Sequence, residues 1–129
     1  MSYTEERVLE MTDREIEKLV AITANIRIAK ENCYGIVIHQ TQYSGTIKRY
    51  YEPCNNANDY MDLAKANEVS IEYKDNMVSA TCAVRHFENY KPLSYISSKT
   101  LPKEETGRAV CEAYLLKMLL NTKINQPNQ

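Results

Sequence analysis

The chain has 129 residues, and its 16 Lys and Arg against 17 Asp and Glu give a formal net charge of −1. This near balance provides no overall positive field for a phosphate backbone, so we expect no generic nucleic-acid binding. A chain of this length buries about two-thirds of its unfolded surface, which predicts a single domain over residues 1–129 that needs no metal or disulfide to fold.

The four cysteines, Cys33, Cys54, Cys82 and Cys111, are widely spaced and include no C-x-x-C pair. This spacing does not indicate a zinc or redox site, so we expect reduced thiols, no cofactor and a cytoplasmic protein. No apolar run approaches the ~20 residues that span a bilayer, so we expect no membrane partner.

The first predicted element is an amphipathic helix beginning at Asp13. Thr12 and Glu15 have the spacing of a capping box just before it. Apolar side chains then recur at helical intervals, as at Ile16 and Leu19. Residues 26–29 either extend this helix or begin an extended segment.

A hairpin and a short helix follow in chain order. Gly35–Ile38 and Thr46–Tyr51 have the β-branched and aromatic composition of strands, and Tyr43–Gly45 between them suits a turn. Asn58 or Asn56 then has the position of a helix cap.

The second half of the chain begins with the clearest hairpin signal. Val69–Tyr73 alternates in polarity, Asp75-Asn76 forms a two-residue turn, and Met77–Val84 is strand-like again. Prolines and serines predict an irregular segment over 89–103. Helical spacing of apolar residues then predicts a helix over 104–121.

This order of helices and hairpins predicts the α+β class, with a small antiparallel sheet made of two hairpins and helices packed on one face. The polar residues from about 123 onward predict a frayed C-terminal tail.

Few residues point to catalysis. His39 and His86 are the two imidazoles, and we expect both at strand ends facing solvent, outside any catalytic triad. Three glycines are too few for a phosphate-cradling loop. Ten tyrosines against one phenylalanine carry many hydroxyls that need partners, so we expect several tyrosines at a surface or a pocket edge.

The stretch after the first hairpin, Pro53–Asp59, allows two interpretations. Pro53 ends the strand through Tyr51, and Asn55 and Asn56 tolerate the left-handed conformation of a tight turn. One interpretation is a capped connector from strand to helix. The other is that the exposed amides and the helix N-terminus bind a polar or anionic ligand group.

Four segments, residues 11–18, 53–59, 67–71 and 107–109, together resemble the NinX-like family of small proteins from tailed phages and prophages. They read MTDREIEK, PCNNAND, NEVSI and GRA. Members of that family have no established biochemical activity. The resemblance implies a phage-encoded protein.

Our leading hypothesis is a non-enzymatic accessory binding protein that counters host defence by sequestering a nucleotide-derived immune signal. A likeness in fold does not imply a shared ligand, so the hypothesis depends on a site. The ligand-binding residues we expect are Tyr51, Cys54, Asn55, Asn56, Asp59 and Arg108.

Two alternatives stay open. One is a protein–protein inhibitor of a host nuclease or regulator, which would present a large surface patch. The other is a metal-assisted nucleotide hydrolase that uses Asp59 and Glu52, although these carboxylates form no recognised ligand pattern. We also expect a homo-oligomer, because small proteins form deep pockets most easily between subunits.

Arg108 lies near the start of the last predicted helix, where a cation opposes the helix dipole. An exposed ion pair with Glu104, Glu105 or Glu112 would contribute about 0–1 kcal/mol of stability and so offset the unfavourable interaction with the dipole. Alternatively, the guanidinium points toward the Asn55-Asn56 turn and binds a ligand's acidic group. We therefore expect Arg108→Ala to abolish binding and to shift the melting temperature by only a few degrees.

Overall fold

The computed structural model describes residues 3–85 and 92–124. The helices are α1 (Glu5–Glu10), α2 (Asp13–Thr23), α3 (Ala57–Asn67) and α4 (Thr106–Ile124), with a 3-10 turn over Lys103–Glu105. The strands are β1 (Ile28–Asn32), β2 (Gly35–Gln42), β3 (Gly45–Tyr51), β4 (Val69–Lys74), β5 (Met77–Arg85), β6 (Pro92–Ser97) and β7 (Leu101–Pro102).

The strands form two separate antiparallel sheets. One has the order β1-β2-β3, and the other has the order β4-β5-β6, with the short β7 also paired to β5. The predicted α+β class is confirmed. The two predicted hairpins, however, belong to different sheets, because each recruits a further strand, β1 or β6, instead of pairing with the other hairpin.

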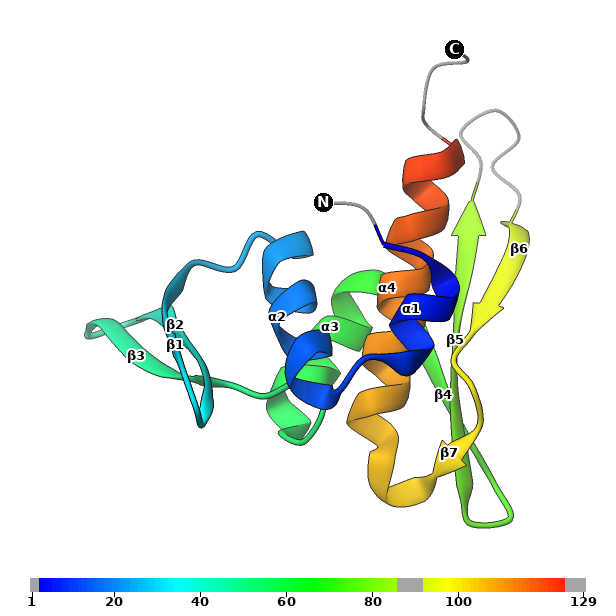
Figure 1. Ribbon diagram of the computed structural model, residues 1–129, viewed down its shortest axis with the longest axis horizontal. Helices are drawn as coiled ribbons and strands as arrows, with labels where there is room; N and C mark the ends of the chain where they lie inside the picture. The colour runs from blue at the N-terminus through cyan, green and yellow to red at the C-terminus, as the bar shows by residue number, and fades with distance from the viewer. Residues whose placement is uncertain (1–2, 86–91, 125–129) are drawn as a thin grey trace.

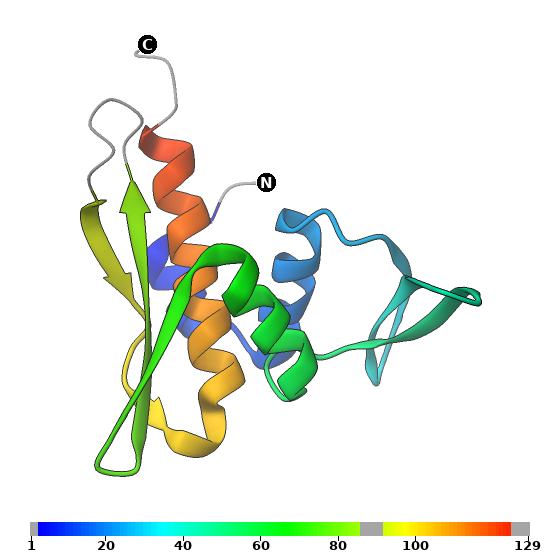
Figure 2. The same cartoon turned by 180° about the vertical axis from the view of Figure 1, so that it is seen from behind.

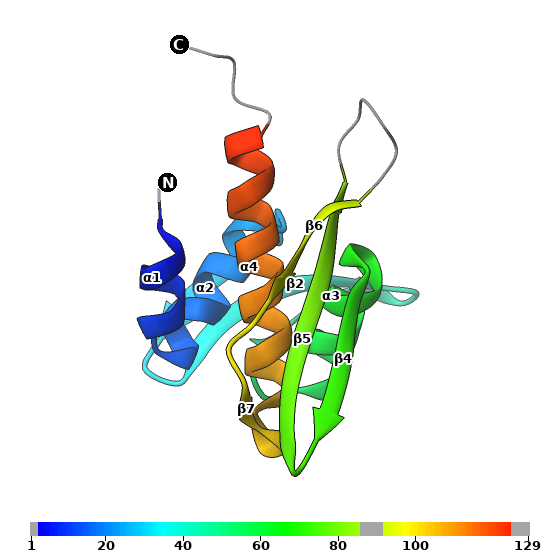
Figure 3. The same ribbon diagram turned by 90° about the vertical axis from the view of Figure 1, so that its right-hand side faces the viewer.

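Helix α4 occupies the centre of the molecule. It lies along one face of the β4–β6 sheet, and α1 and α2 lie on its far side (Figure 3). The β2–β3 hairpin reaches away from this helical body (Figures 1 and 2). All residues from Thr106 to Leu116 are buried, which is typical of a helix enclosed in a core rather than lying on a surface.

One hydrophobic cluster connects both sheets and all four helices. It includes Val8 of α1, Ile16 of α2, Leu63 of α3 and Ala109, Val110, Ala113 and Leu115 of α4, with Ile36, Ile38 and Tyr51 from one sheet and Val78 and Ala80 from the other. Small side chains on α4 let its neighbours approach closely. None of the helices in the described ranges is long and apolar enough to cross a bilayer.

Several local predictions are confirmed. The capping box of α2 is present: Thr12 Oγ1 accepts from Glu15 N at 3.2 Å, and Glu15 Oε1 accepts from Thr12 N at 3.2 Å. Asp75 and Asn76 have φ of 54° and 62°, as a two-residue hairpin turn requires. Residues 28–32 form β1, so the extended alternative for this segment is the correct one.

Other expectations were wrong, or they concern residues outside the described ranges. The segment predicted to be irregular contains β6, which forms because β5 offers it a free edge. His39 lies within β2 and is half-buried, rather than ending the strand in solvent. Helix α1 was not predicted, and α4 continues through the expected start of the tail. His86, residues 89–91 and the tail from 125 lie outside the described residues.

Candidate functional site

A cleft of about 640 Å³ lies between the end of α2, the β2–β3 hairpin, α3 and α4. Its volume is within the range of pockets that bind small ligands, about 300–1,000 Å³. The apolar part of the lining comes from Ile38, Tyr51, Leu63 and Tyr114. Polar side chains at the lining include Thr23, His39, Gln40, Arg49, Asp59, Asp62 and Asn67.

Strand alternation places two of these residues on the same side of the hairpin. Arg49 pairs with Ile38 and Tyr51 pairs with Ile36 in the β2–β3 register. Directly opposed residues share a face of an antiparallel sheet, so all four side chains are on the face toward the helices. Ile36, Ile38 and Tyr51 there belong to the core cluster.

An ion pair between the half-buried Arg49 and the buried Asp59 connects β3 to the first turn of α3. Arg49 Nη2 lies 2.7 Å from Asp59 Oδ1, and Arg49 Nη1 donates to Asp59 Oδ2 at 3.1 Å. Asp59 is 2% exposed, and its Oδ2 also accepts from Glu52 N at 2.9 Å. Arg49 Nε donates to Gln40 Oε1.

The bidentate pair fixes β3 and the first turn of α3 relative to each other where they line the cleft. The hydrogen bonds that Arg49 donates to Asp59 raise the pKa of Arg49, so the guanidinium stays charged. Both Asp59 oxygens already accept hydrogen bonds from Arg49 and from the Glu52 backbone. We therefore assign Asp59 a structural role in the lining of the cleft and not the role of a general base.

Two tyrosine rings belong to the lining of the cleft. Burial raises the pKa of Tyr51 and of Tyr114, so both hydroxyls are neutral at physiological pH. Tyr114 Oη lies 2.9 Å from Thr23 Oγ1, which satisfies its hydrogen-bonding capacity. Their neutral rings can pack against a planar apolar group.

The Pro53–Asn56 turn packs between α2 and the start of α4. Cys54 N donates to Glu17 Oε2 at 3.2 Å, and Cys54 is 3% exposed. A Cβ at Gly107 would lie 2.5 Å from the Pro53 carbonyl oxygen, so only glycine allows this approach. The turn therefore connects elements of the core.

The asparagines of this turn differ from the expectation in one respect. Asn56 Oδ1 accepts from Asp59 N at 3.2 Å and caps α3, as predicted. Its φ of −92° is extended, and Asn55 is not among the residues with positive φ. The turn does not need the left-handed region, because Asn55 N and Asn56 N both donate to the Glu52 carbonyl.

Arg108 is 5% exposed and is not among the residues that line the cleft. Its Nε donates to Glu112 Oε2 at 2.7 Å, its Nη1 to Asp13 Oδ1 at 3.1 Å and its Nη2 to the Val8 carbonyl at 3.2 Å. The ion pair with Glu112 forms, but it is buried and not exposed. A pair buried to this degree predicts a larger fall in melting temperature on Arg108→Ala than the few degrees expected for an exposed pair.

The predicted binding residues thus separate into two groups. Tyr51 and Asp59 line the cleft, whereas Cys54, Asn55, Asn56 and Arg108 are not among its lining residues. Sequence reasoning missed Arg49, Gln40 and Tyr114. The alternation of β3 is a signal that would have paired Arg49 with Tyr51, but the approach of α4 has no counterpart in local sequence.

Buried titratable groups gather beside the turn. Burial raises the pKa of Glu17 to about 7, and burial also raises the pKa of the Cys111 thiol.

All four cysteines are free, and three of them are buried, as expected for small core side chains. Within residues 3–85 and 92–124, no group of three or more His, Cys, Asp or Glu side chains is arranged to hold a metal ion.

Comparison of the sequence with protein-family models found no match, and comparisons with curated proteins and with solved structures found none either. The resemblance to the NinX-like family therefore stays a prediction.

Proposed function

We propose that this protein acts by binding, and that it holds a small nucleotide-like ligand in the cleft between the β2–β3 hairpin, α3 and α4. The observation that carries the proposal is the combination of an apolar lining that includes Tyr51 and Tyr114 with a polar rim. Ligand sites typically combine a mostly apolar lining with a few fixed polar groups.

The chemistry of the cleft suits a planar heterocycle. Tyr51, Leu63 and Tyr114 form a largely buried apolar floor, with 5%, 6% and 2% exposure, and the side chains of Gln40 and Asn67 offer donors and acceptors for the edge of a base. The Arg49–Asp59 pair keeps the wall rigid, which lowers the entropic cost of binding.

The resemblance to phage proteins supports a biological context for this binding. We propose that the protein is phage-encoded, that it works in the cytoplasm of an infected bacterium, and that it sequesters a nucleotide-derived immune signal. A homo-oligomer is part of the proposal, because small proteins form deep pockets most easily between subunits.

Isothermal titration calorimetry tests the proposal directly. The parent protein is titrated with a panel of cyclic dinucleotides, ADP-ribose derivatives and mononucleotides. We expect saturable heat with at least one member. No heat and no thermal shift with any member would remove the proposal, and a stable complex with a host nuclease instead would favour the inhibitor alternative.

A matched pair of variants locates the binding. Ala66 is exposed on α3 and lines the cleft, so Ala66→Phe fills the cleft without disturbing the core. Met61 is exposed on the same helix but does not line the cleft, so Met61→Phe is the control. We expect Ala66→Phe alone to weaken binding at least tenfold. Equal affinity of both variants would place the ligand elsewhere.

A further inference from the structure

The face of the β1–β3 sheet that points away from the helices has a composition unlike the rest of the molecule. The strand registers place Lys30 opposite Val37, His39 opposite Lys48, and Tyr50 opposite Val37 from the other side. These residues alternate with the core-facing residues Ile36, Ile38 and Tyr51, so they form the outer face. Val37 is absent from the core cluster that contains Ile36 and Ile38, although it is only 5% exposed in the central strand, between Lys30 and Tyr50.

The outer face is positively charged. Residues 27–51 contain four Lys and Arg and one Glu, so this segment has a formal charge of +3, and the remainder of the chain has −4. Arg49 faces the helices and pairs with Asp59, so the cations available to the outer face are Arg27, Lys30 and Lys48. Glu31 faces the other side and pairs with Lys18 at 2.9 Å. Among the described residues, neither Lys30, Lys48 nor Arg27 has a carboxylate within ion-pair distance. The near-neutral total charge conceals this separation.

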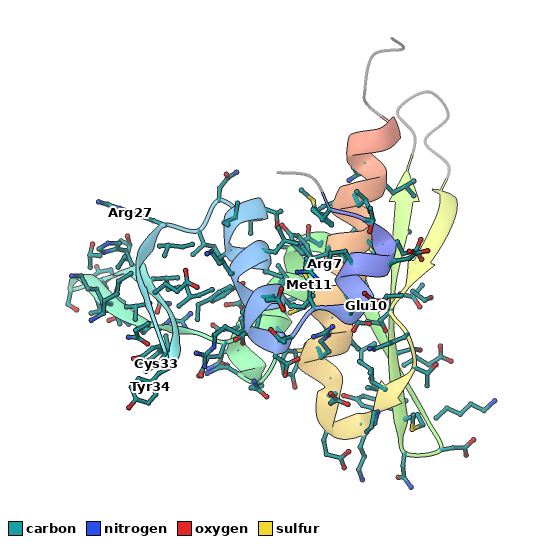
Figure 4. All side chains as sticks on the ribbon, in the orientation of Figure 1. Arg7, Glu10, Met11, Arg27, Cys33 and Tyr34 are labelled. Carbon is teal, nitrogen blue, oxygen red and sulfur yellow. The ribbon has the colours of Figure 1, made fainter. Side chains whose placement is uncertain are left out.

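Exposed aromatic rings accompany the cations. Tyr50 is 39% exposed on the outer face, held by a 3.1 Å hydrogen bond from Asn32 Nδ2 to its hydroxyl. Tyr34 is 73% exposed in the β1–β2 turn, and Tyr43 is fully exposed in the β2–β3 turn. Figure 4 shows Arg27 pointing away from the helices at one end of β1 and Tyr34 pointing outward at the other end.

We propose that the outer face of the β1–β3 sheet binds single-stranded nucleic acid, with bases stacked on the tyrosine rings and phosphates held by Arg27, Lys30 and Lys48. Sheets that bind single strands combine exposed aromatic rings with a basic surface, because every base has a stacking face and every linkage has a charge. A duplex keeps its bases stacked inside, so it would engage only the cations.

An anionic membrane would be attracted by the same cations, but this face lacks the apolar groups that insert into a bilayer. Its other exposed side chains are the hydroxyl-bearing Thr41 and Thr46. Arg27, His39 and Thr41 also belong to the lining of the cleft. Lys30, Lys48 and the exposed Tyr34, Tyr43 and Tyr50 do not, so substitutions at these positions test the outer face apart from the cleft. Neither proposal depends on the other.

Fluorescence anisotropy with labelled oligouridylate and oligothymidylate of about twelve nucleotides tests this inference. We expect binding at low salt with a slope of log K against log salt of about −2, as roughly three phosphate contacts to a single strand give. We expect much weaker binding of a duplex of the same length and of vesicles containing phosphatidylserine. No binding of either single strand, or tighter binding of the duplex or the vesicles, would overturn the proposal.

Two double variants that remove the same charge from different surfaces distinguish binding at the outer face from a nonspecific effect of net charge. Lys30→Gln with Lys48→Gln should weaken binding at least tenfold, whereas Lys65→Gln with Lys74→Gln, at exposed positions on α3 and β4, should change it less than twofold. Equal losses in both double variants would sink the assignment. Circular dichroism confirms that each variant is folded.

The contribution of stacking is tested at Tyr43, which is fully exposed and therefore has no role in the core. Tyr43→Ala should lower the affinity roughly tenfold, as the loss of one stacked base predicts. Tyr43→Phe keeps the ring and should restore the parent affinity. Unchanged binding by the alanine variant would show that the rings take no part.

Discussion

Substitution of Arg108 by alanine is the sharpest test of how α4 is held in the core. The guanidinium connects Glu112, which is fully buried, with Asp13 of α2 and the carbonyl of Val8 in α1. Arg108→Ala would leave the Glu112 carboxylate buried, with the Lys99 backbone N–H at 3.2 Å as its nearest remaining donor and the Lys99 ammonium 3.9 Å away. This replaces the expectation of an exposed pair.

The magnitude follows from burial. Removing one partner of a buried ion pair costs about 3–5 kcal/mol, because an uncompensated charge stays in the interior. For a chain of this length, 1 kcal/mol corresponds to about 4 °C, so we expect the melting temperature to fall by about 10–20 °C.

Thermal and urea unfolding followed by circular dichroism measure this loss. Arg27→Ala is the control, because Arg27 is exposed and should change the free energy of unfolding by less than about 0.5 kcal/mol. The double variant Arg108→Met, Glu112→Gln removes both charges and should recover much of the loss, with a coupling of about 1–3 kcal/mol. A melting temperature of Arg108→Ala within a few degrees of the parent would refute the buried-pair reasoning.

Three further predictions concern the Pro53–Asn56 turn and its neighbours. Burial raises the pKa of Glu17 from 4.5 to about 7, so the folded state retains a proton that the unfolded state releases, and stability falls by about 3 kcal/mol as pH rises from about 4.5 through 7. Glu17→Gln should remove this dependence and exceed the parent in stability above pH ~7, as urea titrations would show; an unchanged pH profile would contradict the assignment. Gly107→Ala should lower stability by about 1–3 kcal/mol in thermal melts, because its Cβ would overlap the Pro53 and Cys54 carbonyl oxygens, and a neutral effect would argue against the close approach. Asn56→Ala should cost about 1 kcal/mol through the lost cap of α3, whereas Asn56→Asp should keep it, and equal melting of both would count against capping.

Both the fold and the site could be predicted where neighbours in sequence are also neighbours in space. The Thr12–Glu15 box and the Asp75-Asn76 turn involve atoms a few residues apart, so composition and spacing specify them. The aromatic strand through Tyr51 and the acidic first turn of α3 could likewise be predicted from the sequence. Tyr51 and Asp59 were therefore among the predicted site residues.

The sequence by itself thus determined the α+β class, the two hairpins, the capped helices and the charge balance of the chain. Tertiary structure decided the rest. Pro92–Ser97 became a strand because β5 offered an unpaired edge, and Arg108 became a buried structural cation because α1 and α2 cover the start of α4. It also decided that Arg49 meets Asp59 in a cleft and that four basic side chains concentrate on one arm of the molecule. These features depend on which faces of distant elements come together, and burial, not local propensity, selects among the possible arrangements.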